Sequence, residues 1–370
     1  MAVDAAIYQS AAFKEFQDLC REKGILERPA GLEQHDVADG LTDDATLMRF
    51  FIARNKDSDA AFQQLKEAFE TRKTVNDIAI HQNIDVDIYE STRPLYPHWT
   101  GRRTKRGIPI CAYDLSYLSG GALVEYHKSR NMPHSTSTDQ SSTLSATQRA
   151  FATYDTLTRF VLPLCSAMRD RPNPESPVSS TIYLVDASQL TIKQALDVRN
   201  YAQDITKLLA TCFPEVIDTI YVLNAPSYFS KIWYLVKRFV DPNTASKLVI
   251  LTSEEVLPTL TQTIDLENIP VQYGGGFSFK QGMVPELDLG LRERLEWFGT
   301  KEGMVPTGPL KWRIGVQGRR VGVAVGTEGG EQREVVFVSL TVEDGKAEET
   351  KIVENDATMV VGDHEVKVVA

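Results

Sequence analysis

The spacing of apolar residues divides the chain into three stretches of different character. Up to about residue 90, apolar positions such as Leu47 and Phe50 recur at helical spacing, which predicts amphipathic helices. Residues 7–28 and a segment that begins near Asp57 show the same pattern. Thr42, followed by two aspartates, is the expected N-cap of the helix between them. The first stretch is therefore predicted to be a small all-helical domain.

Short β-branched runs replace the helical pattern in the second stretch, and helix-length segments separate the later runs. Strands that alternate with helices predict an α/β domain with a largely parallel sheet. The predicted strands are 107–115, 180–188, 218–226 and 246–252, and the predicted helices are 146–169, 191–211 and 226–240.

The third stretch reads as strands joined by glycine and acidic turns, which predicts a small antiparallel β module that ends with a strand in "TMVVGDHEVKVVA". Its last 30 residues, 341–370, hold eight acidic residues and three lysines. The sequence thus predicts three domains, with boundaries at 1–90, 91–285 and 286–370. Truncation near residue 285 would test this division, because activity should survive it if the α/β domain is the active unit.

The net charge of the chain limits the classes of partner that it can bind. A formal net charge of −10 over 370 residues argues against non-specific nucleic-acid binding, which needs a basic surface. Contact with anionic membranes would then come from local patches. One candidate is the basic cluster Arg102, Arg103, Lys105 and Arg106, although such a cluster is more often a solvated hairpin turn. No signal peptide and no apolar run of about 20 residues is apparent, so a cytoplasmic location is expected.

The chain lacks the common catalytic motifs. It has no phosphate-binding loop of the G-x-x-x-x-G-K type, no G-x-G-x-x-G after a strand and no G-x-S-x-G. Its four cysteines and six histidines are scattered without the spacing of a metal site. The glycines of "YGGGF" at 273–277 predict a tight chain reversal rather than a phosphate cradle. We therefore expect no catalytic residues, no metal, no cofactor and no enzymatic activity.

Several segments together resemble a known family. "LMRFFIARN", "TIYLVDAS", the run "CFPEVIDTIYVLNAPSYFSKIWYLVKRFVDPNTASKLVIL" and "ENIPVQYGGG" are similar to the CRAL-TRIO lipid-binding domain, in its branch of fungal phosphatidylinositol/phosphatidylcholine transfer proteins. The resemblance covers about residues 40–280. It implies a sheet floor and helices that enclose an apolar lipid pocket, with a mobile gate helix.

The resemblance also implies a headgroup site. The family positions that hold the phosphoinositide headgroup fall on Arg54, Glu215, Thr244 and Lys247, and all four residue types match. Arginine and lysine donate charge-assisted hydrogen bonds to phosphate. Two other interpretations remain open: Lys247 and Glu215 as a surface ion pair, and Arg54 as a contact between domains.

The family's phosphatidylcholine positions are poorly matched. They fall on Thr100, Cys111, Tyr154, Thr181 and Tyr183, of which only Tyr154 is the expected residue. Tyr183 places a large ring where the family has a small side chain, so a different apolar second ligand, such as a sterol, is expected. Tyr183 also suggests haem ligation through a tyrosinate as an alternative, beside the simpler role of a packed strand tyrosine.

The segment 226–240 corresponds to the gate helix of the family. Its apolar face would be formed by Phe229, Ile232, Trp233, Val236 and Val240, with Pro226 in the first helical turn. An ordinary helix packed on the core is the alternative.

The sequence therefore predicts a protein that binds phosphatidylinositol and a second, unidentified apolar ligand, and that exchanges lipid at cytosolic membrane surfaces as a peripheral protein. It leaves open whether the protein transports lipid or presents it to a lipid kinase. A haem-binding protein or a non-exchanging interaction scaffold on the same fold are the alternatives.

Overall fold

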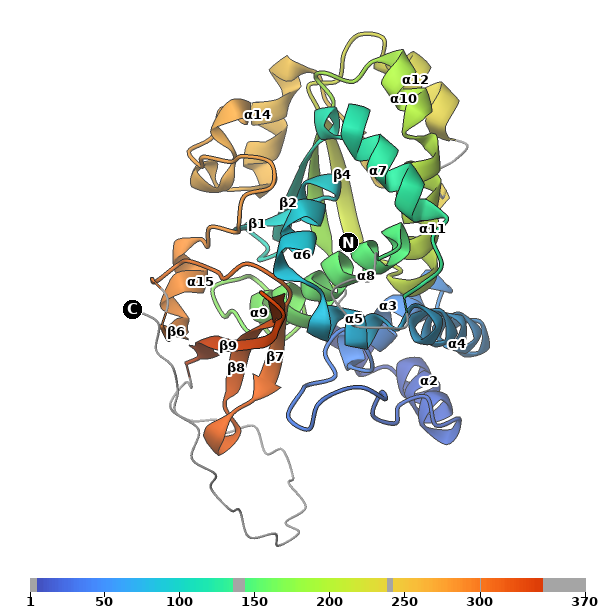
Figure 1. Ribbon diagram of the computed structural model, residues 1–370, viewed down its shortest axis with the longest axis vertical. Helices are drawn as coiled ribbons and strands as arrows, with labels where there is room; N and C mark the ends of the chain where they lie inside the picture. Colours follow the sequence, from blue (N-terminus) through green and yellow to red (C-terminus); the bar gives the residue numbers. More distant parts are fainter. Residues whose placement is uncertain (1–4, 136–143, 238–241, 300, 342–370) are drawn as a thin grey trace, which may run out of the picture.

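The computed structural model describes residues 5–135, 144–237, 242–299 and 301–341. It contains a five-stranded and a four-stranded sheet, with a group of N-terminal helices beside both (Figure 1). No helix among the described residues is long and apolar enough to cross a bilayer.

The N-terminal part is helical, as the sequence predicts. The first predicted helix is broken at Ser10, whose side chain caps the next helix by accepting a hydrogen bond from Phe13 N. The expected N-cap Thr42 is wrong by one residue, because the Asp43 carboxylate accepts from Thr46 N instead. Asp57 caps the following helix. The helices are α1 (Ala5–Tyr8), α2 (Ala11–Glu22), α3 (Asp44–Ala53), α4 (Ser58–Val75), α5 (Asp77–Asn83) and α6 (Val86–Thr92).

The central sheet has the strand order β1-β2-β3-β4-β5. All neighbours are parallel except β1 and β2, which form an antiparallel hairpin. The sequence predicted β2 to β5 but missed β1, because its two arginines were assigned to a basic turn. The strands are β1 (His98–Arg103), β2 (Pro109–Asp114), β3 (Thr181–Asp186), β4 (Ile217–Leu223) and β5 (Leu248–Ile250).

Helices lie on two sides of this sheet, with α14 on one side and α7, α10, α11 and α12 on the other (Figure 1). The predicted helix 146–169 is interrupted by a π-helical turn, η3 (Leu157–Val161), because Pro163 has no N–H to continue the α-helical ladder. The helices are α7 (Gly120–Arg130), α8 (Ala146–Thr156), α9 (Leu162–Ser166), α10 (Ile192–Asp197), α11 (Arg199–Cys212), α12 (Phe229–Val236), α13 (Pro242–Ser246) and α14 (Ser253–Thr263).

The glycine cluster after α14 makes the predicted chain reversal. Phe277 N donates to Ile269 O, and a Cβ at Gly275 would lie only 2.0 Å from that same oxygen. Glycine is therefore required for close backbone contact, with no phosphate cradle involved.

The C-terminal module is an antiparallel sheet in the order β6-β9-β8-β7. Its elements are α15 (Leu289–Glu293), β6 (Leu295–Trp297), β7 (Leu310–Ile314), β8 (Arg320–Glu328) and β9 (Glu331–Leu340). The strand predicted in 358–370 lies outside the described residues.

This sheet is built into the rest of the molecule. Trp312 is fully buried, stacks on Phe160 of η3 at 5.0 Å and donates its indole N–H to Phe160 O. Lys311, also buried, donates to Asp36 at 2.6 Å and to Gln82 at 2.6 Å. A cut near residue 285 would therefore open an aromatic core and leave buried charges without partners, and whether the α/β domain is active without this sheet stays a prediction.

Candidate functional site

The predicted headgroup residues Glu215 and Lys247 lie together where β4 and β5 begin. Lys247 Nζ donates to Glu215 Oε2 at 2.8 Å and to the backbone oxygen of Ile217 at 2.8 Å. The two charged side chains are only 17% and 21% exposed. The pair is therefore better shielded from water than an ordinary surface ion pair, and a phosphate would have to compete with Glu215 for the ammonium group.

The backbone of Glu215 adopts a left-handed conformation with φ of +54°, which is rare for a residue with a side chain. Its carboxylate is held from a second direction by Asn243 Nδ2, which donates to Oε1 at 2.5 Å. Strained residues held in place by their surroundings concentrate at functional sites. The sequence reading missed Asn243, although it lies next to Thr244 in the same motif.

The other two predicted headgroup residues are less closely joined to this pair. Thr244 is half-buried on α13, and its backbone oxygen accepts from Lys247 N at 3.1 Å. Arg54 is exposed at the C-cap of α3, and in the part of the chain that the structure describes its guanidinium makes no hydrogen bond or ion pair. The joint role of the four residues therefore stays a prediction.

The predicted second-ligand residues are all buried, at 4% exposure or less. Strand register places Cys111 opposite Tyr183, and Trp99 opposite Cys111, so these three side chains share one face of the sheet. Thr181 Oγ1 donates to Pro109 O at 2.8 Å, and Thr100 Oγ1 donates to Ile110 O at 2.8 Å. The two threonine hydroxyls thus already serve the backbone.

Tyrosine rings fill the space between this face of the sheet and the helices. Tyr154 of α8 packs edge-on against Tyr96 and at 5.5 Å from Phe213. The six buried tyrosines of this region are Tyr96, Tyr113, Tyr126, Tyr154, Tyr183 and Tyr201. Since close-packed rings leave little space, an acyl chain or any other large ligand would need some of them to move.

Three buried polar groups in this region have no hydrogen-bond partner among the described residues: the indole N–H of Trp99 and the hydroxyls of Tyr154 and Tyr183. The two tyrosine hydroxyls lie close enough to affect each other's pKa, without normal hydrogen-bond geometry. An unpaired buried donor costs about 1–3 kcal/mol, so three in one region need a physical reason.

The haem alternative fits this interior poorly. Burial raises the pKa of Tyr183 well above its usual value, and the neighbouring Tyr154 raises it further. The phenol is therefore held in its neutral form, whereas an iron ligand would be the tyrosinate. The tightly packed rings around it also leave no room for a macrocycle.

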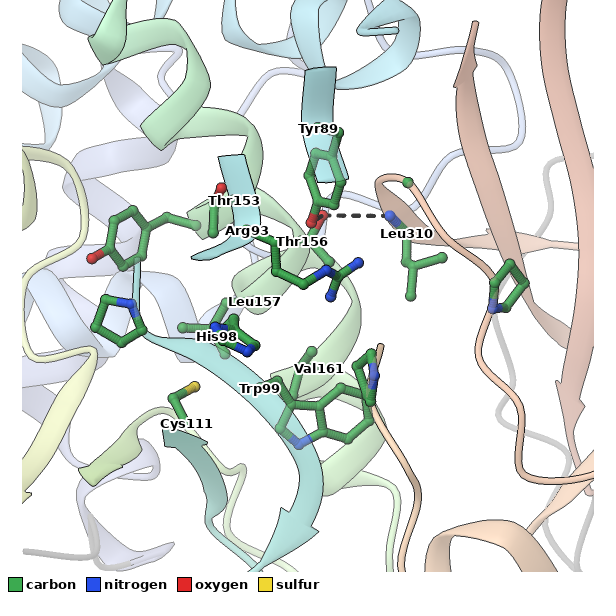
Figure 2. Close-up of a pocket in the computed structure, with 15 residues that line it drawn as sticks. Tyr89, Arg93, His98, Trp99, Cys111, Thr153, Thr156, Leu157, Val161 and Leu310 are labelled. Atoms are coloured by element: carbon green, nitrogen blue, oxygen red, sulfur yellow. Dashed lines mark hydrogen bonds between the residues drawn. The ribbon is translucent and has the colours of Figure 1, made fainter. Parts of the chain in front are cut away.

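A cavity of about 40 Å³ lies beside these rings, between β1, α8 with η3, and the loop that leads into β7. Figure 2 shows Trp99 and His98 of β1, Leu157 and Val161 of η3 and Leu310 of β7 around it. Water occupies about 30 Å³ in the liquid, and ligand pockets usually measure about 300–1,000 Å³. The cavity is thus far too small for a whole phospholipid.

The predicted gate helix is α12, and it is shorter than expected. It begins at Phe229, so Pro226 lies before the helix and the expectation of a proline in the first turn is wrong. Phe229 and Ile232 are buried, and Trp233 is half-buried. Val236 is the last residue of the helix, and Val240 lies outside the described residues.

The buried side of α12 belongs to a small apolar cluster that is separate from the main core. We call it the gate cluster; its members are Ala187, Leu190, Ala195, Val222, Phe229 and Ile232. Beside it, Tyr228 Oη donates a side-chain hydrogen bond to Leu190 O at 3.0 Å. The helix is therefore attached by few contacts.

The basic cluster near residue 103 is only partly a surface feature. Arg103 is buried and makes ion pairs with Asp170 and Asp288, and Arg102 is buried beside Glu286. Lys105 and Arg106 are exposed, but Arg106 pairs with Asp218. The interpretation of the whole cluster as a solvated or lipid-binding patch is wrong, because Arg102 and Arg103 hold α15 and the preceding loop against β1.

The described residues offer no site for a metal ion, since no three histidine, cysteine or acidic side chains gather in ligand geometry. All four cysteines are free and buried. Burial raises the pKa of the Cys111 thiol to about 12, so this sulfur is a neutral part of the cavity wall.

Comparison with known proteins gives a consistent result. Residues 124–275 match the family model described as the CRAL/TRIO domain. The chain is 27% identical over 300 residues to the SEC14 cytosolic factor of Kluyveromyces lactis, covering 80% of this chain and 88% of that protein. It is 27% identical over 265 residues to the SEC14 cytosolic factor of Eremothecium gossypii, with 72% and 75% covered. It is 24% identical over 274 residues to the phosphatidylinositol/phosphatidylcholine transfer protein SFH9 of Arabidopsis thaliana, with 72% and 43% covered. The solved structure of Sfh5 aligns at 14% identity with a TM-score of 0.45, covering 74% of this chain and 96% of that one.

Proposed function

We propose that this chain, whose residues 124–275 match the CRAL/TRIO domain model and which is 27% identical to two fungal SEC14 cytosolic factors, binds one phospholipid molecule, preferably phosphatidylinositol, and exchanges it at membrane surfaces. The relatives named as phosphatidylinositol/phosphatidylcholine transfer proteins support lipid transfer as the activity. In this proposal the protein performs no covalent chemistry.

The observation that carries the choice of phosphatidylinositol is the shielded pair of Lys247 and Glu215. An incoming phosphate accepts from the Lys247 ammonium group, which frees the Glu215 carboxylate to accept hydrogen bonds from inositol hydroxyls. Thr244 adds a hydroxyl beside them, and Arg54 supplies a second cation when the ligand draws it in. A cation paired with a carboxylate suits a ligand that carries both phosphate and hydroxyl groups.

Lipid entry requires the closed interior to open, and α12 is the element best suited to move. Among the described residues, its inner side is held by the gate cluster, by the Tyr228 hydrogen bond and by partly buried apolar residues packed against the cluster: Leu115, Ile220, Ala225, Trp233 and Leu248. Displacing α12 exposes the space beneath it to acyl chains, whose burial contributes about 0.8 kcal/mol for each CH₂ group. The cluster whose contacts are lost has six buried members, far fewer than the main core.

The outer surface near the gate suits a membrane. Tyr234 is 71% exposed. Figure 1 shows α7, α10 and α12 together at one end of the molecule. Further exposed apolar side chains lie on or next to these helices: Tyr117, Val124, Ile192, Leu196 and Tyr228. Lys193, Lys231 and Lys237 are exposed on α10 and α12, with Asp197 as the one acidic side chain on these two helices. Apolar residues beside lysines favour an anionic bilayer surface.

The experiment that tests the proposed function is native mass spectrometry of the purified protein with lipid extraction, followed by transfer assays between vesicles. Phosphatidylinositol is expected on the wild type and strongly reduced on Lys247→Ala. Lys280→Ala, which removes an exposed lysine elsewhere, is the matched control and should retain the lipid.

Three results would overturn the proposal. A lipid that binds equally to wild type and Lys247→Ala would remove the headgroup site. A Soret band in the visible spectrum of the purified protein would favour haem. A protein that binds partners but moves no lipid between vesicles would favour a non-exchanging scaffold.

A further inference from the structure

The C-terminal sheet is open along the first part of its strand β9. Strand β6 pairs with β9 only from Val338 to Leu340, and Phe298 N, just after β6, donates to Phe337 O at 2.9 Å. Among the described residues, the stretch 331–336, which we call the open edge, therefore has β8 on one side and no strand on the other. A strand edge of this kind presents backbone N–H and C=O groups that another strand can pair with.

The turn between β8 and β9 determines which backbone groups face the open edge. Gly329 and Gly330 both have positive φ, at +58° and +97°, and form a two-residue hairpin turn. Such a turn is closed by a hydrogen-bonded pair, here Glu328 and Glu331. Hydrogen-bonded and non-hydrogen-bonded pairs then alternate along the two strands.

The hydrogen bonds of β8 agree with this alternation. Val325 is the partner of Glu334, and its N–H donates to Pro309 O on the other side of β8. The pair of Val325 with Glu334 is therefore a non-hydrogen-bonded one, and so is the pair that contains Gln332, two residues earlier. The backbone groups of Gln332 and Glu334 thus point away from β8, toward the open edge.

Large apolar side chains are exposed where β6 ends. Phe298 is 36% exposed, Val335 is 40% exposed and Val336 is 43% exposed. Lysine and proline, which commonly protect open strand edges, are both missing from the sequence "EQREVV" of residues 331–336. A strand that pairs here would cover apolar surface as well as backbone groups.

The polar side chains of the open edge are held on the faces of the sheet. Gln332 Nε2 donates to Gln82 O at 3.0 Å, and Glu334 pairs with Arg313 of β7. These side chains therefore do not extend across the edge, and they leave it accessible to a strand.

The chain itself supplies a matching segment. Residues 364–370, "HEVKVVA", lie outside the described residues, and their sequence alternates in the way typical of a strand, with Val366 and Val368 on one side and Lys367 between them. The linker 342–363 spans more than about 70 Å when extended. The distance back along β9 from Leu340 to Gln332 is only about 27 Å. The segment can therefore reach the open edge.

The tether favours this segment over a separate molecule. A linker of this kind gives an effective concentration on the order of 1 mM, above the concentration of a second copy in solution. Because the linker leaves from the C-terminal end of β9, the segment meets the open edge beside Phe298 and runs antiparallel to β9. The register that places Lys367 opposite Glu334 also places Val366 opposite Val335, and both kinds of cross-strand pair are stabilising.

From these observations we propose that residues 364–370 dock on the open edge of β9 as a fifth, antiparallel strand of the C-terminal sheet. The docked segment covers the backbone groups of Gln332 and Glu334 and prevents a second copy of the chain from pairing there. This contact does not depend on the proposed lipid binding.

The first test is hydrogen exchange on the full-length protein, measured by mass spectrometry. In the wild type, the amides of Gln332 and Glu334 are expected to be protected. Lys367→Pro removes the N–H that faces Glu334 and should make exchange in residues 331–336 about tenfold faster. Lys351→Pro makes the same change in the linker and is the matched control, with exchange at the wild-type rate.

The second test is disulfide formation in full-length variants. Val335→Cys combined with Val366→Cys places two thiols in a non-hydrogen-bonded pair, whose close Cα spacing suits a disulfide. Val335→Cys combined with Val353→Cys, in the linker, is the control. The four native cysteines are buried and should not compete. Under mild oxidation, the first pair should form an intrachain disulfide about tenfold faster than the control pair.

Three results would overturn the inference. Equal exchange of residues 331–336 in wild type and Lys367→Pro would show that the segment does not cover the open edge. Equal rates of disulfide formation in the two cysteine pairs would show that residue 366 has no preferred place beside Val335. A disulfide that joins two chains would show that a second copy occupies the edge. Thermal unfolding of each variant establishes that the rest of the protein is folded.

Discussion

The gate and the junction with the C-terminal sheet lie at opposite ends of the molecule and are held by different kinds of contact (Figure 1). At the gate, α12 rests on the gate cluster and leaves Tyr234 largely exposed. At the junction, Trp312 is completely buried and stacks on Phe160, whose ring also packs against Phe337, and Lys311 reaches the buried Asp36.

This difference in contacts indicates that α12 can move while the C-terminal sheet stays in place. Contacts of a small apolar cluster can be broken a few at a time, whereas a buried ion pair that opens leaves two charges without partners. We therefore expect ligand exchange to proceed through the gate, while the junction stays closed and keeps the cavity wall in place.

The largest expected effect is that of removing residues 286–370. The truncation would expose Phe160 and leave Asp36 without Lys311 and Arg313, so we expect no cooperative unfolding transition and no lipid transfer. Circular dichroism melting and a vesicle transfer assay measure both effects. A soluble, transfer-competent fragment of residues 1–285 would show that the junction is dispensable and that the comparison fails.

A smaller but sharper test is Asp36→Asn. Asp36 pairs with Lys311 and Arg313 and lies 3.9 Å from Arg159, so the substitution removes the negative charge that serves three cations. We expect a loss of about 3–5 kcal/mol in the free energy of unfolding, the usual effect of breaking a buried pair. Glu33→Gln, at a carboxylate that is 43% exposed, is the control and should lose less than about 1 kcal/mol. Equal losses in urea titrations would mean that burial of Asp36 is unimportant.

Acid should lower the free energy of unfolding through protonation of His98. Burial lowers its pKa from 6.5 to about 4, so the unfolded chain binds a proton between these pH values while the folded protein does not. Stability is therefore complete above about pH 6.5 and falls as the pH drops toward 4, by up to about 3 kcal/mol from this group. His98→Gln should lessen this acid sensitivity in urea titrations at pH 7 and pH 4.5. An unchanged difference between the two pH values would remove His98 as the cause.

Much of the fold was predictable because the apolar pattern is strong where elements are regular. Strands β2 to β5 and the helix that follows Asp57 were found in this way. Strand β1 was missed since its sequence, "HWTGRR", contains two arginines that look exposed. Their partners Asp170, Glu286 and Asp288 are distant in sequence, so no local pattern indicates that Arg102 and Arg103 are buried.

Less of the candidate site than of the fold could be predicted from the sequence. The motif located Glu215 and Lys247, but it indicated neither Asn243 nor the unpaired Trp99. The role of Asn243 depends on the left-handed backbone of Glu215, and that of Trp99 depends on strand register. The closed interior was also invisible in sequence, as side-chain packing between the sheet and the helices decides it. Motifs thus locate the residues, and only the fold shows what each one contacts.

The smallest effect on stability is expected for a substitution in the gate cluster, which should make lipid transfer faster. Ile232→Ala removes a buried side chain from the gate cluster, which should weaken the attachment of α12 by about 2 kcal/mol and raise the open population by up to about thirtyfold. Because α12 can detach without global unfolding, the melting temperature should change little, while phosphatidylinositol transfer between vesicles becomes faster. Leu260→Ala, a fully buried deletion in the main core, is the control and should lower the melting temperature without faster transfer. If Ile232→Ala instead behaved like Leu260→Ala, α12 would be an ordinary core helix, and lipid would have to enter elsewhere.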